Sequence, residues 1–230
     1  MKRILIAEDD RVLRKRIVKA ILRIGSAVTV QEAADTKEAI DYLGKQSVDL
    51  VITDIRMPKG SGLMVLAYLN AFLPDVPCFV ITAYGTSRLK DKMPPDLLRF
   101  YDKPFEVGDF AVAVIAATSR QRGAAPCLGI QLPNFINLAA ADGVTATITV
   151  THAEHGSCKL FLKEGELIDA LSGFERGEAV AVAALAWEKP EYSIELEIPA
   201  DCERTIKTPL HNLLRISCDC FDEQLGTSGP

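Results

Sequence analysis

The chain has 230 residues and a formal net charge of −5, and this length predicts two domains. The charge is unevenly divided, because residues 1–122 contain 19 Lys and Arg against 15 Asp and Glu, net +4, whereas residues 123–230 contain 7 against 16, net −9. A strongly acidic second half repels phosphates, and no basic helix-turn-helix pair is visible, so a nucleic-acid partner is disfavoured. The opposite signs also allow the two halves to attract each other, although salt screens exposed charges.

The sequence has no apolar run of membrane-spanning length and no signal-peptide pattern, which predicts a cytoplasmic protein without a membrane partner. Its six cysteines have no regular spacing. We therefore expect reduced thiols rather than a disulfide framework.

Four short hydrophobic runs, rich in β-branched and aromatic residues, predict buried parallel strands in the first half. They cover residues 4–7, 49–53, 77–81 and 99–101. Helical patterns follow them at residues 11–24, 36–43, 63–72 and 106–120. This alternation of strand and helix predicts an α/β domain with a doubly wound parallel sheet.

The helix predicted at residues 11–24 has an apolar and a basic face. The expected buried face comprises Val12, Leu13, Ile17, Ala20, Ile21 and Ile24. The expected solvated face comprises Arg11, Arg14, Lys15, Arg16, Lys19 and Arg23, with docking of a histidine-containing donor as the alternative. Asp10, immediately before the helix, is expected to be its N-cap.

Charged and hydroxyl side chains follow the last apolar residue of each predicted strand. Glu8 and Asp9 follow the first run, Asp54 the second, Thr82 the third and Lys103 the fourth. Because ligands bind outside the carboxyl ends of the strands in such sheets, these side chains are expected to converge. Adjacent carboxylates repel one another unless a divalent cation neutralises them, and oxygen ligands favour Mg²⁺. Asp54 is the candidate nucleophile, able to form an aspartyl-phosphate.

Residues 1–120 resemble the receiver domain of two-component response regulators. The resemblance rests on Glu8-Asp9, Asp54-Ile55-Arg56-Met57-Pro58, Thr82-Ala83 and Lys103-Pro104-Phe105. It implies a five-stranded flavodoxin-like fold and a phosphoryl group accepted from a sensor histidine kinase or phosphotransfer protein. Such a chain is a signalling switch and not an enzyme, beyond self-phosphorylation from small donors and autodephosphorylation.

The resemblance also implies a role for individual residues. The Mg²⁺ ligands would be Glu8, Asp9, Asp54 and the backbone carbonyl of Arg56. Lys103 and Thr82 would bind phosphoryl oxygens, and Thr82 and Phe100 would form the switch. The Lys103–Pro104 peptide bond is expected to be cis. A phosphoryl group on Asp54 would draw Thr82 and Lys103 inward and change the nearby surface.

Two features depart from the family pattern. Pro94-Pro95 removes two backbone donors, so the helix before the last strand is expected to be short or distorted. Arg56 and Tyr84 are large side chains at positions where they could hinder an attacking water. Asp102 is interpreted as a loop residue rather than a ligand.

The second half predicts a different architecture, an α+β module with an antiparallel sheet. Helices are expected at residues 135–141, 177–187 and 209–221. Strands are expected at residues 145–151, 157–163, 167–170 and 192–198. The predicted domains are therefore a receiver at 1–120, a linker at 121–127, an α+β domain at 128–222 and a tail at 223–230.

The second half resembles PATAN-type effector domains through the hairpin at residues 158–170, Gly177-Glu178-Ala179-Val180 and Trp187. This resemblance implies binding of a protein partner or self-association rather than catalysis. His152, His155 and His211 are expected to be exposed or to cap turns, and Trp187 to lie in the core. Cys218 and Cys220 are two apart in a helix and would face different directions.

Two alternatives to a phosphorylation-switched regulator of proteins remain. One is an aspartyl-phosphate phosphohydrolase, which would require a second acid where this chain has Arg56. The other is a DNA-binding transcriptional response regulator, which the acidic second half disfavours.

Overall fold

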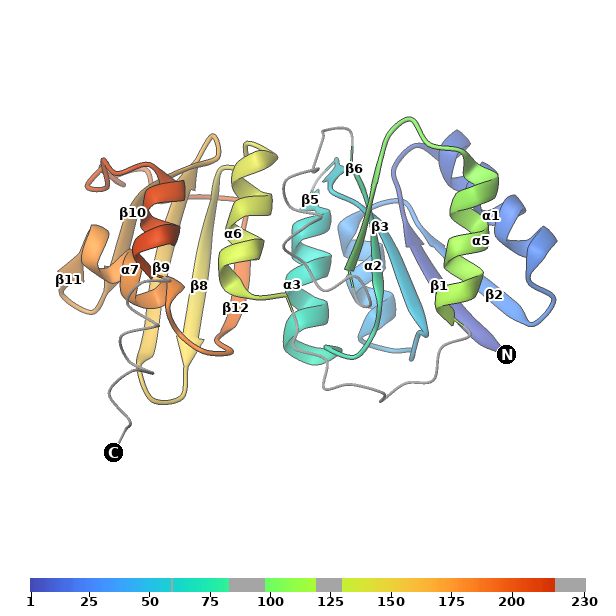
Figure 1. Ribbon diagram of the computed structural model, residues 1–230, viewed down its shortest axis with the longest axis horizontal. Helices are drawn as coiled ribbons and strands as arrows, with labels where there is room; N and C mark the ends of the chain where they lie inside the picture. The colour runs from blue at the N-terminus through green and yellow to red at the C-terminus, as the bar shows by residue number, and fades with distance from the viewer. Residues whose placement is uncertain (59, 83–97, 119–129, 218–230) are drawn as a thin grey trace. The chain divides into compact units, whose positions relative to one another are not determined.

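The computed structural model describes residues 1–58, 60–82, 98–118 and 130–217. Contacts divide the chain into two compact units, Met1–Ile130 and Gln131–Pro230. Each unit contains its own five-stranded sheet (Figure 1). The predicted linker at 121–127 and tail at 223–230 lie outside the described residues, so the finer domain bounds stay a prediction.

The first unit is built on a parallel sheet of strand order β2-β1-β3-β6-β7. Its strands are β1 (Lys2–Ala7), β2 (Val28–Ala33), β3 (Leu50–Asp54), β6 (Cys78–Thr82) and β7 (Leu98–Asp102). A short antiparallel pair, β4 (Arg56–Met57) and β5 (Gly60–Ser61), follows β3. This order is that of the flavodoxin-like doubly wound fold, which confirms the predicted fold class.

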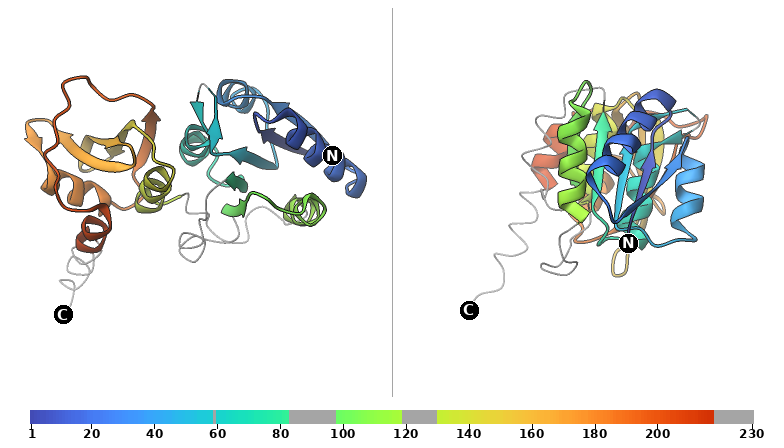
Figure 2. Two further views of the ribbon diagram at one scale, coloured as in Figure 1. Left: turned by 90° about the horizontal axis from the view of Figure 1, so that it is seen from above. Right: turned by 90° about the vertical axis from the view of Figure 1, so that its right-hand side faces the viewer.

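Helices cover both faces of this sheet, as a parallel sheet requires. They are α1 (Arg11–Ile24), α2 (Thr36–Leu43), α3 (Gly62–Phe72) and α5 (Val107–Thr118). Helices α1 and α5 pack together on one face, and α2 and α3 on the other (Figures 1 and 2). The Asp10 side chain accepts hydrogen bonds from the N–H groups of Val12 and Leu13, which confirms the predicted N-cap.

The predicted faces of α1 were partly wrong. Val12 and Ile24 were expected to be buried but are 69% and 46% exposed, whereas Ile17 and Ile21 are fully buried. Arg14 was expected on the solvated face but is only 9% exposed. It lies on the same stripe as Ile17 and Ile21, because positions 14, 17 and 21 recur at helical spacing. An ion pair with Glu32 on β2 compensates the burial of the Arg14 guanidinium.

Strand β2 (Val28–Ala33) did not appear among the predicted hydrophobic runs. Among the described strands it pairs with β1 alone, and it lies at an edge of the sheet. Only its first and last residues are buried, and Gln31 and Glu32 in its middle are polar. An edge strand with this composition lacks the continuous apolar run that marks a central parallel strand.

The second unit confirms the predicted antiparallel sheet, which has the order β11-β10-β9-β8-β12. Its strands are β8 (Ala146–His152), β9 (Gly156–Lys163), β10 (Glu166–Ser172), β11 (Glu175–Arg176) and β12 (Glu191–Glu195). Its helices are α6 (Leu132–Ala141), α7 (Glu178–Leu185) and a helix over 210–217. The last predicted strand was expected to reach residue 198 but ends at Glu195. Cys218 and Cys220 lie outside the described residues.

A buried carboxylate connects three segments of the second unit. Asp169 on β10 is 1% exposed and accepts a hydrogen bond from Arg176 Nε at 2.6 Å and another from the Thr205 hydroxyl. The N–H groups of Thr205 and Ile206 both donate to the carbonyl of Ile168, so the 205–206 segment is fixed along β10.

Trp187 was expected in the core of the second unit, but it lies only partly buried at the surface. Its ring stacks on His155 with 5.6 Å between ring centroids, and His155 stacks on His152 at 4.6 Å. His152 Nδ1 accepts a hydrogen bond from the N–H of Glu154, a turn-capping contact of the predicted kind. His211 is exposed near the start of the 210–217 helix.

None of the described helices combines the length and the apolarity that crossing a bilayer requires.

Candidate functional site

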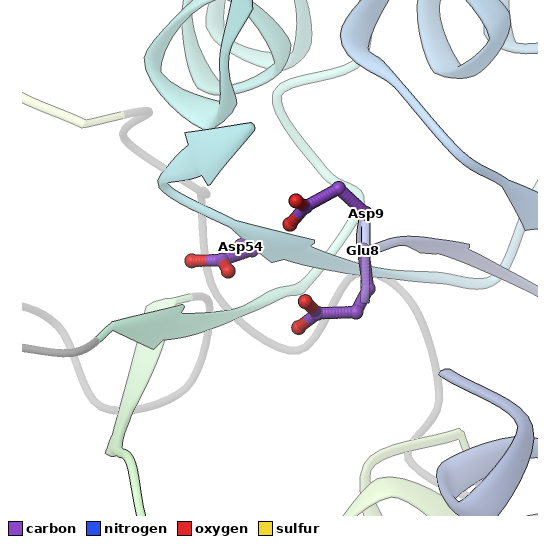
Figure 3. A group of neighbouring side chains, drawn as sticks. All are labelled: Glu8, Asp9 and Asp54. Atoms are coloured by element: carbon purple, nitrogen blue, oxygen red, sulfur yellow. The ribbon is translucent and has the colours of Figure 1, made fainter. Parts of the chain in front are cut away.

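Three carboxylates meet at the carboxyl edge of the parallel sheet. Glu8 and Asp9 directly follow β1, and Asp54 is the last residue of the neighbouring strand β3. Because Ala7 is in register with Thr53, the two strands deliver these acids to the same point. One oxygen atom from each carboxylate lies within 4.8 Å of the others. Figure 3 shows the three side chains close together, with Glu8 and Asp9 at the end of one strand and Asp54 on its neighbour. The acids that the sequence placed at two strand ends therefore form one cluster.

Lys103, directly after β7, bridges two of these acids. Its Nζ donates to Asp54 Oδ2 at 2.6 Å and to Glu8 Oε2 and Oε1 at 2.9 and 3.1 Å. Burial alone would lower the pKa of Lys103, but the hydrogen bonds to Asp54 and Glu8 outweigh it and raise the pKa above its usual value. The ammonium is therefore retained at neutral pH.

Burial sets the protonation of Glu8, which has no exposed surface. Desolvation raises the pKa of Glu8 from 4.5 to about 7, and the neighbouring charge of Asp54 adds to this effect, while the hydrogen bonds from Lys103 oppose it. With every carboxyl ionised, three acids and one lysine give the cluster a formal charge of −2. An all-oxygen cluster with this charge suits a divalent cation such as Mg²⁺.

The backbone around Asp54 fixes its orientation. Its second oxygen, Oδ1, accepts a hydrogen bond from the N–H of Arg56 at 3.2 Å. Gly62, the first residue of α3, lies against the Asp54 backbone: a Cβ at this position would be 2.0 Å from the Asp54 carbonyl oxygen. Only glycine fits there. No pattern in the sequence indicates this contact, because it arises from the approach of α3 to β3.

Thr82 ends β6 and lies beside β7, where it is in register with Asp102 and is 4% exposed. The N–H of Lys103 donates to the carbonyl of Thr82 at 2.7 Å. Asp102 is the last residue of β7 rather than a loop residue.

Phe100 on β7 is in register with Val80 and is 8% exposed. The Lys103–Pro104 peptide bond is cis, as predicted. Ala83, Tyr84 and the Pro94-Pro95 pair lie outside the described residues, so the expectations for them stay predictions.

A flavodoxin-like sheet with an acidic cluster and a lysine at its carboxyl edge defines a signalling domain of the receiver class. Residues 4–115 match the family described as the response regulator receiver domain. The chain belongs to this family. Receiver domains are signalling switches that bind Mg²⁺ in an acidic pocket and interact with histidine kinases or phosphotransfer proteins.

Individual relatives match the same part of the molecule. The chain is 33% identical over 110 residues to the response regulator receiver protein CpdR of Brucella abortus, covering 47% of this chain and 90% of CpdR. It is 30% identical over 122 residues to the transcriptional regulatory protein PdtaR of Mycobacterium tuberculosis, covering 53% of this chain and 58% of PdtaR. The matched region thus spans little more than half the length of PdtaR. The receiver domain of HemR from Leptospira biflexa is 26% identical with a TM-score of 0.47, covering 54% of this chain and all of that domain.

Proposed function

We propose that this protein accepts a phosphoryl group on Asp54 in a Mg²⁺-dependent reaction and passes the resulting change to its second unit, which binds a protein. The donor is a sensor histidine kinase or a phosphotransfer protein. The protein is a switch whose only chemistry is self-phosphorylation from small donors and autodephosphorylation.

The contact between Lys103 and Asp54 carries this proposal. The two residues are 49 positions apart, yet their charged groups lie 2.6 Å from each other beside Glu8 and Asp9. A structural ion pair would need one acid for one lysine. Here one lysine faces a cluster of three acids, an excess of negative charge that costs stability unless the site binds a cation.

The chemistry follows from the positions of these groups. A carboxylate oxygen of Asp54 attacks the phosphorus of the donor, the donor's P–N or P–O bond breaks, and an acyl phosphate forms on Asp54. Mg²⁺ held by Glu8, Asp9, Asp54 and the Arg56 carbonyl would neutralise the charge that develops on the phosphoryl oxygens. The Lys103 ammonium then exchanges its contact with Asp54 for a contact with a phosphoryl oxygen.

The switch follows from the new charge on Asp54. A dianionic group attracts Lys103 and the Thr82 hydroxyl, and Phe100 on the adjacent strand takes up the space that Thr82 leaves. Phosphorylation thereby shifts a population between two conformations of this edge.

The second unit supplies the output in this proposal. Its antiparallel sheet, its hairpin at residues 158–170 and the helix after Gly177 support the PATAN-type assignment. Its net charge of −9 beyond residue 122 supports a protein partner or self-association over a nucleic acid.

The acceptor assignment is tested with acetyl phosphate and MgCl₂, which should label the wild-type chain once, as read by intact mass. Asp54→Asn should abolish the label. Asp41→Asn removes an acid of α2 that is paired with Lys37 and lies outside the cluster, so it should label like the wild type. Equal labelling of Asp54→Asn and wild type would refute the assignment.

The output is tested by light scattering and by affinity capture with the full chain before and after phosphorylation. A change of oligomeric state or of captured protein supports the proposal. Tight, salt-sensitive DNA binding would instead support a transcriptional regulator, and turnover of a phosphate ester would support a phosphohydrolase.

A further inference from the structure

Arg14 differs from the other basic residues of α1. Arg11, Lys15, Arg16, Lys19 and Arg23 are exposed, whereas the Arg14 side chain is only 11% exposed. It points from the first half of α1 to the chain segment that carries Glu8 and Asp9. A buried guanidinium is costly unless its donors are used, so its contacts indicate its role.

The contacts of Arg14 join the acidic pocket to β2. Its Nη1 donates to the backbone carbonyl of Glu8 and lies 3.4 Å from the carbonyl of Asp9. Its Nε donates to Glu32 Oε2 at 3.2 Å, and Lys15 Nζ contacts the other oxygen of Glu32 at 2.7 Å. The hydrogen bond from Lys15 lowers the pKa of Glu32 most, and the hydrogen bond from Arg14 lowers it further. The Glu32 carboxylate therefore stays ionised.

We propose that Arg14, held by Glu32, is a positioning residue for the metal site: it fixes the backbone of Glu8 and Asp9 so that their carboxylates face Asp54. This inference rests on the proposed Mg²⁺-dependent function and adds two residues that contact neither metal nor phosphate.

The geometry requires a guanidinium in particular. Glu8 follows the last residue of β1, and a buried carbonyl at this point needs a donor. The planar fork of arginine presents Nη1 to the carbonyls and Nε to Glu32 at the same time, whereas the ammonium of a lysine is a single point. The positive charge of Arg14 alone would repel a cation bound at the acidic cluster. The negative charge of Glu32 offsets this repulsion.

The test compares Arg14→Met with Lys15→Met. Both substitutions remove one positive charge from α1 and one hydrogen bond from Glu32, but only Arg14 contacts the carbonyls of Glu8 and Asp9. Titration with MgCl₂ alone, followed by calorimetry, should show Mg²⁺ affinity reduced by about tenfold or more for Arg14→Met, the usual effect of losing an outer-shell contact. Lys15→Met should stay within about twofold of the wild type, since an exposed pair contributes little.

The labelling rate with acetyl phosphate gives a second readout. In Arg14→Met the MgCl₂ concentration for half-maximal rate should rise while the rate at saturating MgCl₂ stays close to that of the wild type. A partly unfolded variant would instead show a lower labelling rate at saturating MgCl₂. Should Arg14→Met fail to fold, Arg14→Lys and Glu32→Gln provide the same comparison, and both should show the raised half-maximal concentration.

The outcomes separate the two proposals. A wild type that binds no Mg²⁺ overturns the proposed function, and the inference with it. A wild type that binds Mg²⁺ while Arg14→Met binds it equally well, or while Lys15→Met loses as much affinity, overturns the inference alone.

Discussion

Lys103 Nζ lies 2.6 Å from Asp54 Oδ2 and 2.9 Å from Glu8 Oε2, so one ammonium stabilises acids from two different strands. The side chain of Lys103 is 25% exposed, whereas those of Glu8 and Asp54 are almost fully buried. The pair of acids therefore depends on this lysine when no other cation is bound.

Replacing Lys103 by Met should destabilise the metal-free protein by about 3 kcal/mol above neutral pH, because buried acids lose their counter-charge. Acid should reduce this cost, since Glu8 can then take up a proton. Urea unfolding of the first unit followed by circular dichroism measures it. Lys2→Met is the control: Lys2 Nζ contacts Asp49 at 3.1 Å with a 44% exposed side chain, and its loss should cost under about 1 kcal/mol. Equal costs would contradict the prediction.

Mg²⁺ affinity should increase as the pH rises through about 7, because burial raises the pKa of Glu8 to this value and only the ionised carboxyl is a ligand. Calorimetry in two buffers of different ionisation enthalpy counts the protons released on binding. The number of protons released per bound Mg²⁺ should approach one below this pH and fall to zero above it. Mg²⁺ binding without proton release at one pH unit below this value would contradict the assignment of Glu8 as a ligand.

The same shift predicts the pH dependence of the metal-free protein. The folded-state pKa of Glu8 is raised, so its contribution to the free energy of unfolding is fully present below about pH 4.5 and is lost as the pH rises through about 7. Saturating MgCl₂ should restore stability above pH 7. Thermal melts across this range, with and without MgCl₂, measure the effect, which should disappear in Glu8→Gln.

Gly62→Ala should destabilise the first unit by about 3 kcal/mol and reduce labelling, because the added Cβ meets the Asp54 backbone at 2.0 Å and displaces it. Gly108→Ala is a matched control on α5, where an added Cβ meets nothing within 4 Å. This control should leave stability unchanged or raise it by up to about 1 kcal/mol. A neutral Gly62→Ala would show that α3 can move away from β3 at little cost.

Asp169→Asn should destabilise the second unit by about 2 kcal/mol, because the hydrogen bonds from Arg176 and Thr205 lose a charged acceptor. The single tryptophan of the chain, Trp187, belongs to this unit, so its fluorescence during urea unfolding follows this unit directly. Glu195→Gln, an exposed acid on β12, serves as control and should be nearly neutral. Comparable losses in both variants would argue against a special role of the buried carboxylate.

The parallel sheet could be predicted because its central strands are continuous apolar runs between helical patterns. Strand β2 was not predicted, because an edge strand with Gln31 and Glu32 in its middle has no continuous apolar run. The second sheet was predicted from alternation, and its last strand was extended too far because the alternation of Leu196 and Ile198 continues beyond the pairing with β8.

The acidic cluster could be located from the sequence because each of its residues follows a predicted strand, and parallel strands end at one edge. The roles of Arg14 and Gly62 could not be predicted from the sequence. The burial of Arg14 depends on Glu32, which lies 18 residues away on the unpredicted strand. The need for glycine at position 62 arises from the approach of α3 to β3, which helical periodicity does not specify.

The hydrogen bond from the Lys103 amide to the Thr82 carbonyl, at 2.7 Å, joins two of the candidate phosphoryl contacts through the main chain. Neither backbone can be displaced far without lengthening this bond. The exchange rate of the Lys103 amide hydrogen with solvent deuterium is therefore a local measure of whether the switch moves side chains alone or the strand ends as well. Unchanged protection on phosphorylation would mean side-chain rotation, whereas faster exchange would mean that β6 and β7 separate at this end.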